Sequence, residues 1–128
     1  MSKTLLVLTT VCLLWAATAA LAMEAPTVTT PTEGAALGPN YDVIGSMPYR
    51  AFLVVMTDVL VCDTGELLRS VPGIRHWTNQ DGSFHFRVAS PRVSIGEKET
   101  KVSYRVRVFE ASAAGNGPET VINCAMAE

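Results

Sequence analysis

The chain has 128 residues, of which 48% are hydrophobic and 17% are charged, and these values suit one globular domain with a real core. Its formal net charge is −2, whereas nucleic acids and anionic membranes bind proteins with a concentrated basic face. We therefore expect no second domain and no nucleic-acid partner.

The N-terminal segment has the pattern of a secretory signal. Lys3 precedes an apolar run that contains Trp15, and the small-residue triplet Ala20-Leu21-Ala22 follows. We expect residues 1–22 to be a signal peptide and residues 23–128 to be a secreted or periplasmic domain with no membrane span after cleavage. The alternative is a retained membrane anchor, although the apolar run is short for crossing a bilayer.

Cleavage would remove Cys12 and leave Cys62 and Cys124 as the thiols of the mature chain. An even pair of cysteines in an oxidising compartment predicts a disulfide between them.

The first predicted strand is a polar lead-in over residues 23–30, which Pro31 ends because proline has no N–H to donate to a ladder. Residues 33–40 have the composition of a turn. Tyr41, Val43 and Gly45 then alternate with Asp42, Ile44 and Ser46, which predicts a short strand.

Residues 51–62 are almost continuously apolar and rich in valine, which favours a strand buried on both faces. Asp58 interrupts this run, so we expect a bend or bulge there, or an edge position where its carboxylate meets water. Residues 63–66 predict a turn, residues 67–69 a short strand, and Ser70-Val71-Pro72-Gly73 another turn.

The strongest local pattern is a turn that leads into a half-buried strand. Asp81-Gly82 predicts the turn, because glycine reaches positive φ without steric cost. Phe84, Phe86 and Val88 then fall on one face of the strand, and His85 falls on the other.

The C-terminal part continues with a polar connection over residues 92–100, for which we expect no helix. Alternating residues then predict a strand with Val102, Tyr104, Val106 and Val108 on its buried face. A loop over residues 113–118 separates it from a last strand over residues 120–124. About seven short strands of this kind predict an all-β fold, an antiparallel β-sandwich.

Four motifs carry a resemblance to a known family: Pro31-Thr32-Glu33-Gly34, Val43-Ile44-Gly45, Asp81-Gly82-Ser83-Phe84, and Tyr104-Arg105-Val106-Arg107-Val108. Together they resemble the bacterial immunoglobulin-like domains of surface proteins and spore-germination proteins. The resemblance implies an immunoglobulin-like β-sandwich, and it brings no catalytic residues. Such domains usually occur in tandem or appended to a larger protein.

The residues offer little for catalysis or metal binding. His76 and His85 are the only histidines, and neither has the spacing of a metal motif or of a nucleophile with its base. We expect no enzyme activity, no cofactor and no metal site.

Aromatic side chains with polar groups are the better candidates for a binding surface. Tyr49 and Arg50 follow Pro48 in a loop, and Trp77 is either a buried anchor of the sandwich or an exposed contact. We therefore predict a binding module whose protein or carbohydrate partner contacts Tyr49, Arg50 and Trp77. The alternatives are a structural component of an envelope assembly, which would use a free strand edge, and a hydrolase inhibitor, which would present a loop such as residues 69–75.

Overall fold

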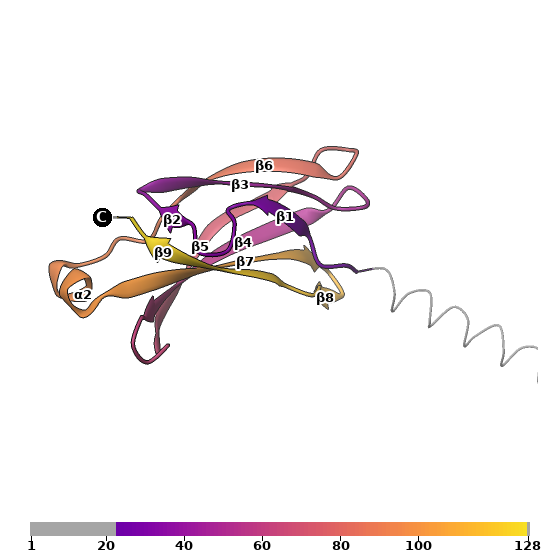
Figure 1. The fold of residues 1–128 in the computed structure, drawn as a ribbon. Coiled ribbons are helices and arrows are strands. Elements are labelled where there is room, and N and C mark those ends of the chain that lie inside the picture. Colours follow the sequence, from indigo (N-terminus) through magenta and orange to yellow (C-terminus); the bar gives the residue numbers. More distant parts are fainter. Residues whose placement is uncertain (1–22, 128) are drawn as a thin grey trace, which may run out of the picture.

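A computed structural model describes residues 23–127. The expected signal peptide, residues 1–22, lies outside the described residues. Figure 1 shows the fold as two layers of strands with one short helix at one end. Its elements are β1 (Thr27–Thr30), β2 (Ala36–Leu37), β3 (Asn40–Ser46), β4 (Phe52–Val61), β5 (Leu67–Trp77), β6 (Ser83–Ala89), α2 (Ile95–Thr100), β7 (Val102–Ser112), β8 (Gly115–Asn116) and β9 (Thr120–Met126).

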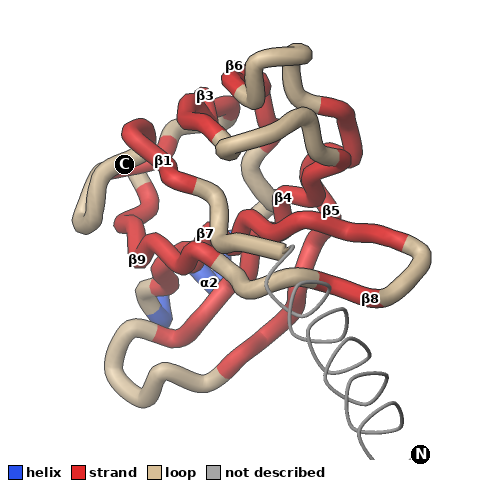
Figure 2. Tube along the Cα trace, turned by 90° about the vertical axis from the view of Figure 1, so that its right-hand side faces the viewer, coloured by secondary structure: helices blue, strands red, loops and turns tan. Residues whose placement is uncertain are grey.

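The two layers are a smaller sheet in the order β1-β3-β6 and a larger sheet in the order β2-β9-β7-β4-β5, with β8 paired to β7. Every pairing is antiparallel except that of β2 with β9, which is parallel. The sandwich predicted from the sequence is therefore confirmed as an all-β, two-sheet architecture. Figure 2 shows the strands of the two layers along the chain trace.

The core lies between the sheets and contains the side chains that the alternating patterns predicted. Phe84, Phe86 and Val88 of β6 are buried, and so are Val102, Tyr104, Val106 and Val108 of β7. Tyr41 of β3 crosses the layer, and its hydroxyl lies 2.5 Å from the Thr57 hydroxyl of β4. Burial raises the pKa of Tyr41 to about 12, so this phenol stays neutral.

Strand β5 corrects the prediction of a turn at residues 70–73. These residues lie inside β5, which runs unbroken from Leu67 to Trp77 at the edge of the larger sheet. An edge strand tolerates Pro72 if its missing N–H points away from the neighbouring strand. The β4–β5 register shifts beside Gly73, where a Cβ atom would lie 2.6 Å from Val88 Cγ1. Gly73 therefore allows the two sheets to approach each other.

Helix α2 corrects the expectation of an irregular connection. Ser94 caps the helix by accepting from the Glu97 N–H, and the Glu97 carboxylate accepts from the Ser94 N–H. This capping box has the Ser-x-x-Glu pattern, which is present in the sequence and went unrecognised. Arg69 of β5 also binds Glu97, with Nη1 2.5 Å from Oε2. The helix is thereby tied to the larger sheet.

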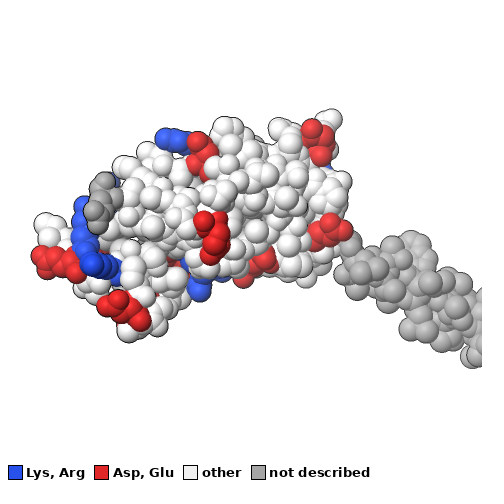
Figure 3. Space-filling view, in the orientation of Figure 1, with Lys and Arg blue, Asp and Glu red and all other residues white. Residues whose placement is uncertain are grey.

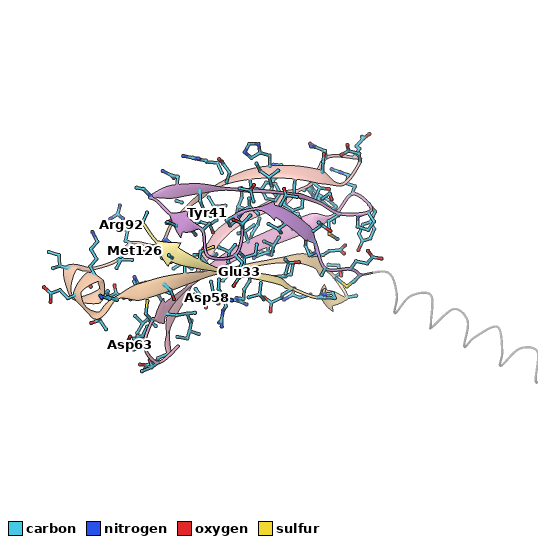
Figure 4. The ribbon with its side chains drawn as sticks, in the orientation of Figure 1. Glu33, Tyr41, Asp58, Asp63, Arg92 and Met126 are labelled. Atoms are coloured by element: carbon cyan, nitrogen blue, oxygen red, sulfur yellow. The ribbon has the colours of Figure 1, made fainter. Side chains whose placement is uncertain are left out.

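Asp58 is neither at an edge nor in water, contrary to expectation. It lies in β4, between β5 and β7, and is 0% exposed. Its carboxylate accepts from Ser70 Oγ at 2.7 Å, Arg105 Nε at 2.8 Å and Arg107 Nε at 2.9 Å. Figure 4 shows Asp58 on the side of the larger sheet away from Tyr41. The ladder irregularities that were expected at Asp58 occur instead between Val55 and Met56 and between Val59 and Leu60, where β4 pairs with β5.

The turn before β6 gives the first stability prediction. Gly82 has φ +90°, and a Cβ atom there would lie 1.9 Å from the Met47 carbonyl oxygen. Gly82→Val should therefore destabilise the domain by about 3 kcal/mol or more, because it adds a clash to an unfavourable φ. His85→Ala should change the free energy of unfolding by less than about 0.5 kcal/mol, because His85 is exposed. Urea unfolding of both variants measures the difference, and equal stabilities would contradict the assigned turn.

The Asp58 carboxylate and its three donors give the second stability prediction. Burial raises the pKa of Asp58, but the hydrogen bonds from Ser70, Arg107 and Arg105 outweigh it and place the pKa below the ordinary 3.8. Asp58→Ala should cost about 3 kcal/mol at neutral pH, because among the described residues it leaves Arg105 without a counter-charge and Arg107 with the exposed Glu119 alone. Glu119→Ala, which removes an exposed partner of Arg107, should cost less than about 1 kcal/mol.

Because the folded pKa of Asp58 is depressed, its contribution is present above pH 4 and is lost as the pH falls through the folded value. The stability gap between wild type and Asp58→Ala should narrow in acid. Urea unfolding at pH 7 and in acid measures this gap, and a gap that is the same at both would show that the charge of Asp58 contributes nothing.

Candidate binding site at the Trp77 end

The candidate site lies at the end of the sandwich that carries β8 and the β3–β4 loop, on the right of Figure 1. Trp77 is the last residue of β5, and Phe52 is the first residue of β4. The antiparallel register pairs these two residues, so their side chains share the outer face of the larger sheet. Arg50 lies two residues before Phe52, in the β3–β4 loop.

Trp77 lies at the centre of the site and is 48% exposed. Of the two interpretations of Trp77 that the sequence left open, the buried anchor is wrong, because the side chain is exposed. The Arg50 guanidinium carbon lies 4.6 Å from the centre of the Trp77 ring, which is the geometry of a cation–π contact. The Phe52 ring meets the Trp77 ring edge to face, with centroids 5.5 Å apart. Trp77 is thus held from two sides while about half of it remains open to a ligand.

Tyr49 has a different role from Arg50. Its hydroxyl donates to Glu110 Oε1 at 2.5 Å and accepts from the Glu24 N–H at 3.3 Å. The ring is half-buried and packs against the core. Burial and the Glu110 carboxylate raise the pKa of Tyr49. Tyr49 therefore ties the loop that carries Arg50 to Glu110 of β7, and its hydroxyl is engaged within the protein.

A groove of about 460 Å³ adjoins Trp77 on the outer face of the sheet. Phe52, Arg75 and Trp77 line it from β4 and β5, and Glu110 and residues 111–113 line it from β7 and the turn that follows. Arg75 makes no ion pair within residues 23–127. The groove therefore combines two aromatic rings with an arginine that is available to an anionic group.

The structure brings Arg50 and Trp77 together and adds Phe52 and Arg75, which the sequence reasoning missed. Phe52 was interpreted as part of a buried run, and Arg75 stood next to a predicted turn. The pairing of β4 with β5 determines that both side chains lie beside Trp77. The sequence did not reveal that pairing, because residues 70–73 are predicted as a turn and lie instead inside β5.

The predicted disulfide between Cys62 and Cys124 is wrong: both cysteines are free. Cys62 follows the end of β4, where its N–H donates to the Lys101 carbonyl, and Cys124 pairs with Tyr104 in β9. Because β7 lies between β4 and β9, two strand spacings of about 4.8 Å separate the cysteine backbones. This exceeds the roughly 7 Å between Cα atoms that a disulfide spans.

The histidines lie outside this groove, on the exposed surface. His85 Nε2 lies 3.4 Å from Asp42 Oδ1, and His76 Nδ1 lies 2.7 Å from the Trp77 carbonyl oxygen. Within residues 23–127 no group of three or more His, Cys, Asp or Glu side chains is placed to hold a metal ion. In the same part of the chain, no helix has the length and hydropathy to cross a membrane.

A larger groove of about 530 Å³ lies at the opposite end, near α2, and Cys62, Cys124, Lys98 and Lys101 contribute to its lining. Figure 3 shows basic side chains gathered at that end of the visible face. No tryptophan, tyrosine or phenylalanine lines this groove. We place the candidate site at Trp77 because an exposed, laterally supported indole is the stronger contact feature.

Comparison with known proteins does not assign the chain to a family. No protein-family model and no curated protein matches the chain. A solved structure, the crystal structure of an engineered protein, matches 80% of this chain with 15% identity and a TM-score of 0.45. The match spans 20% of that protein's own length. A likeness of this size carries no argument about function.

The cysteines give a chemical test of the geometry. In the native domain a thiol reagent should modify Cys62 quickly, because Cys62 is exposed. Cys124 should resist, because it is 4% exposed and burial raises the pKa of its thiol to about 11. After denaturation without a reductant both thiols should react. Absorbance-based thiol titration of protein beginning at Met23 measures this, and an absence of reactive thiols in the denatured protein would restore the disulfide.

Proposed function

We propose that residues 23–128 act as a secreted or periplasmic, non-catalytic binding module of immunoglobulin-like fold in a bacterial cell envelope. The ligand binds at the Trp77 site. The observation that carries the proposal is an indole that is 48% exposed yet supported by Arg50 and Phe52. Holding a large aromatic side chain in place before binding lowers the ordering entropy that binding costs.

Two features support the immunoglobulin-like assignment. Strands β3, β4, β6, β7 and β9 take the places of strands B, C, E, F and G, and β5 extends the GFC sheet as a C′ strand does. Tyr104 lies near the start of β7, and its buried hydroxyl donates to the Pro91 carbonyl at 3.3 Å. A tyrosine at this corner that bonds back to the preceding connection recurs in immunoglobulin-like sandwiches. The disulfide between sheets that antibody domains have is missing here.

The chemistry of the site favours a ligand with a flat or apolar part and an anionic group. The open part of the Trp77 ring offers contact area, and Arg75 offers a planar donor that suits a carboxylate. Protein segments and acidic saccharides both carry such groups. Catalysis has less support, because Ser112, the hydroxyl of the groove, donates to the Gly115 carbonyl and Glu110 accepts from Tyr49, so the two do not pair as a nucleophile with its base.

One observation favours a second candidate, a structural component of an envelope assembly. Strand β5 has 11 residues and forms an edge of the larger sheet that no other described strand covers. The inhibitor alternative loses its support, because residues 69–75 lie within β5 and do not form a protruding loop.

Trp77 itself reports on the proposed site. It is the only tryptophan of residues 23–128, so the intrinsic fluorescence of the mature domain comes from this ring. The domain is titrated with acidic oligosaccharides and, separately, with acidic peptides. The class of ligand that binds should shift the emission of Trp77 and protect its ring from quenching by iodide. Substitution Arg50→Gln should weaken that binding by about threefold to tenfold, because it removes a cation from one side of the ring.

Val121→Ser is the matched control, because Val121 is 46% exposed but lies on β9, away from the groove. It should leave the titration unchanged. If ligands from an envelope extract bind the domain while the emission of Trp77 stays constant, the site lies elsewhere and the proposal fails.

A further inference from the structure

Hydrogen bonds at both ends of the β4–β5 ladder identify the backbone groups of β5 that face outward. Val61 N–H donates to the Glu66 carbonyl, and Thr78 N–H donates to the Ala51 carbonyl. Odd-numbered residues of β4 therefore exchange hydrogen bonds with β5, and in an antiparallel ladder the intervening pairs do not. The outward-facing residues of β5 are the register partners of the even-numbered residues, namely Leu67, Ser70, Pro72, Arg75 and Trp77.

Pro72 and Gly73 divide this edge into two parts. Pro72 has no N–H, and at an outward position it interrupts pairing with a new strand without costing a bond to β4. Beyond Gly73, Arg75 and Trp77 direct their N–H groups away from the sheet. The Trp77 carbonyl already has a partner in His76 Nδ1 at 2.7 Å. The N–H and carbonyl of Arg75 and the N–H of Trp77 remain open for an added strand.

A second groove, of about 400 Å³, lies on the other side of this short edge, between β5 and β6. Ile74, Phe84 and Phe86 contribute apolar surface, and Trp77 lines this groove as well as the outer one. The close approach of Gly73 to Val88 brings the two sheets together next to it. Because side chains of a strand alternate between its two faces, one added strand would fill both grooves.

Basic side chains dominate the rim. Arg75 lines the outer groove, and Arg87, His76 and His85 line the groove between the sheets. Asp42 contacts Arg87 at 3.2 Å and His85 at 3.4 Å. Glu110 lines the far side of the outer groove, where Tyr49 binds it. With the histidines counted as neutral, Arg50, Arg75 and Arg87 outnumber the carboxylates of Asp42 and Glu110 by one. A ligand that runs along Arg75 and Trp77 therefore meets a small excess of positive charge.

We propose that an extended acidic segment of a partner protein adds as a short antiparallel or parallel strand to the β5 edge at Arg75 and Trp77. This inference rests on the proposed function and names the class of its ligand. Main-chain hydrogen bonds provide affinity, and the two grooves select alternate side chains. A second copy of this chain fits less well, because β5 carries Arg69 and Arg75 and no acidic residue, so self-pairing would bring like charges together.

The test measures backbone amide protection, which an ordinary surface contact would leave unchanged. The domain of residues 23–128 is titrated with a synthetic, end-blocked peptide that alternates glutamate and valine. Hydrogen exchange followed by NMR should show new protection at the Arg75 and Trp77 amides. The Ile74 and His76 amides already face β4 and should change little, which makes them internal controls. Peptide binding without protection at Arg75 and Trp77 would overturn the proposal.

Two peptide controls separate backbone pairing from charge. A peptide of the same sequence with N-methylated amides on one edge should bind about tenfold more weakly, because it loses hydrogen bonds to Arg75. A lysine and valine peptide should not bind. Two methylated peptides are needed, one for each edge of the peptide strand. If both bind as tightly as the unmethylated peptide, strand addition is wrong.

Two variants of Arg75 separate the contribution of its charge to peptide binding from the contribution of its backbone N–H. Arg75→Gln removes the charge and keeps the outward N–H, whereas Arg75→Pro removes both and, like Pro72, costs no bond to β4. Peptide affinity should fall modestly in Arg75→Gln and by about a further tenfold in Arg75→Pro. Matched melting temperatures exclude unfolding. If Arg75→Pro does not fold, the amide protection experiment decides alone.

The outcomes also distinguish this inference from the proposed function. If an acidic oligosaccharide changes the Trp77 emission and the peptide does not bind, strand addition is wrong and the binding module stands. If neither ligand changes the emission, both proposals lose their support. If gel filtration shows a dimer that Arg75→Pro dissociates, the β5 edge pairs with a second copy and the acidic partner is wrong.

Discussion

The buried carboxylate of Asp58 is the interaction on which the larger sheet depends. It lies in the inner strand β4, between β5 and β7, and accepts hydrogen bonds from Ser70 of β5 and from Arg105 and Arg107 of β7. An unpaired buried charge is too costly to tolerate, so the three strands must keep the register that brings these donors to Asp58. A slip of one residue would move the donors to the opposite face. The cluster therefore specifies the alignment of β5 as well as adding to stability.

The candidate site is a consequence of that alignment. With Asp58 opposite Ser70 and the one-residue register shift at Gly73, the same ladder places Trp77 opposite Phe52 at its end and Arg75 opposite Val54. The β3–β4 loop then brings Arg50 over the indole, and the bond between Tyr49 and Glu110 holds that loop to β7. An interaction in the middle of the sheet thus positions side chains at its end. Arg50 is thereby held in place by contacts on both sides of its loop, although it belongs to no strand.

Much of the fold could be predicted from the sequence, because its buried faces follow simple periodicity. Phe84, Phe86 and Val88 alternate along β6, and Val102 to Val108 alternate along β7, so both faces were assigned correctly. Arg50 and Trp77 were also identified before their contact was known. These predictions depend on local properties, namely alternation, turn chemistry and the character of single side chains.

The predictions that were wrong concern residues whose structural neighbours are distant in sequence. Pro72 ends a central strand but not an edge strand, and the position of β5 at an edge is a property of the whole sheet. Asp58 looked like a defect in an apolar run because its partners lie 12 to 49 residues further along the chain. The cysteine count suggested a disulfide, yet strand order keeps Cys62 and Cys124 two strands apart. Helix α2 is the exception, because its capping box is local and was overlooked.

The edges of the two sheets show why β5 is the edge to which a partner strand would add. On the larger sheet the opposite edge strand, β2, has only two residues. On the smaller sheet β1 has four residues and an irregular register with β3. The other edge strand of that sheet, β6, has seven residues in regular register with β3 and carries Arg87, which pairs with Asp42. Natural sheets protect their edges with short strands, irregularities, prolines and charges, because a long, free edge invites aggregation. In β5, Pro72 and the irregularity at Gly73 protect the middle of the strand, while Arg75 and Trp77 leave a short part open. The part of this edge after Gly73 lies beside an exposed tryptophan and two grooves, so it combines open backbone groups with the apolar surface that an added strand would contact.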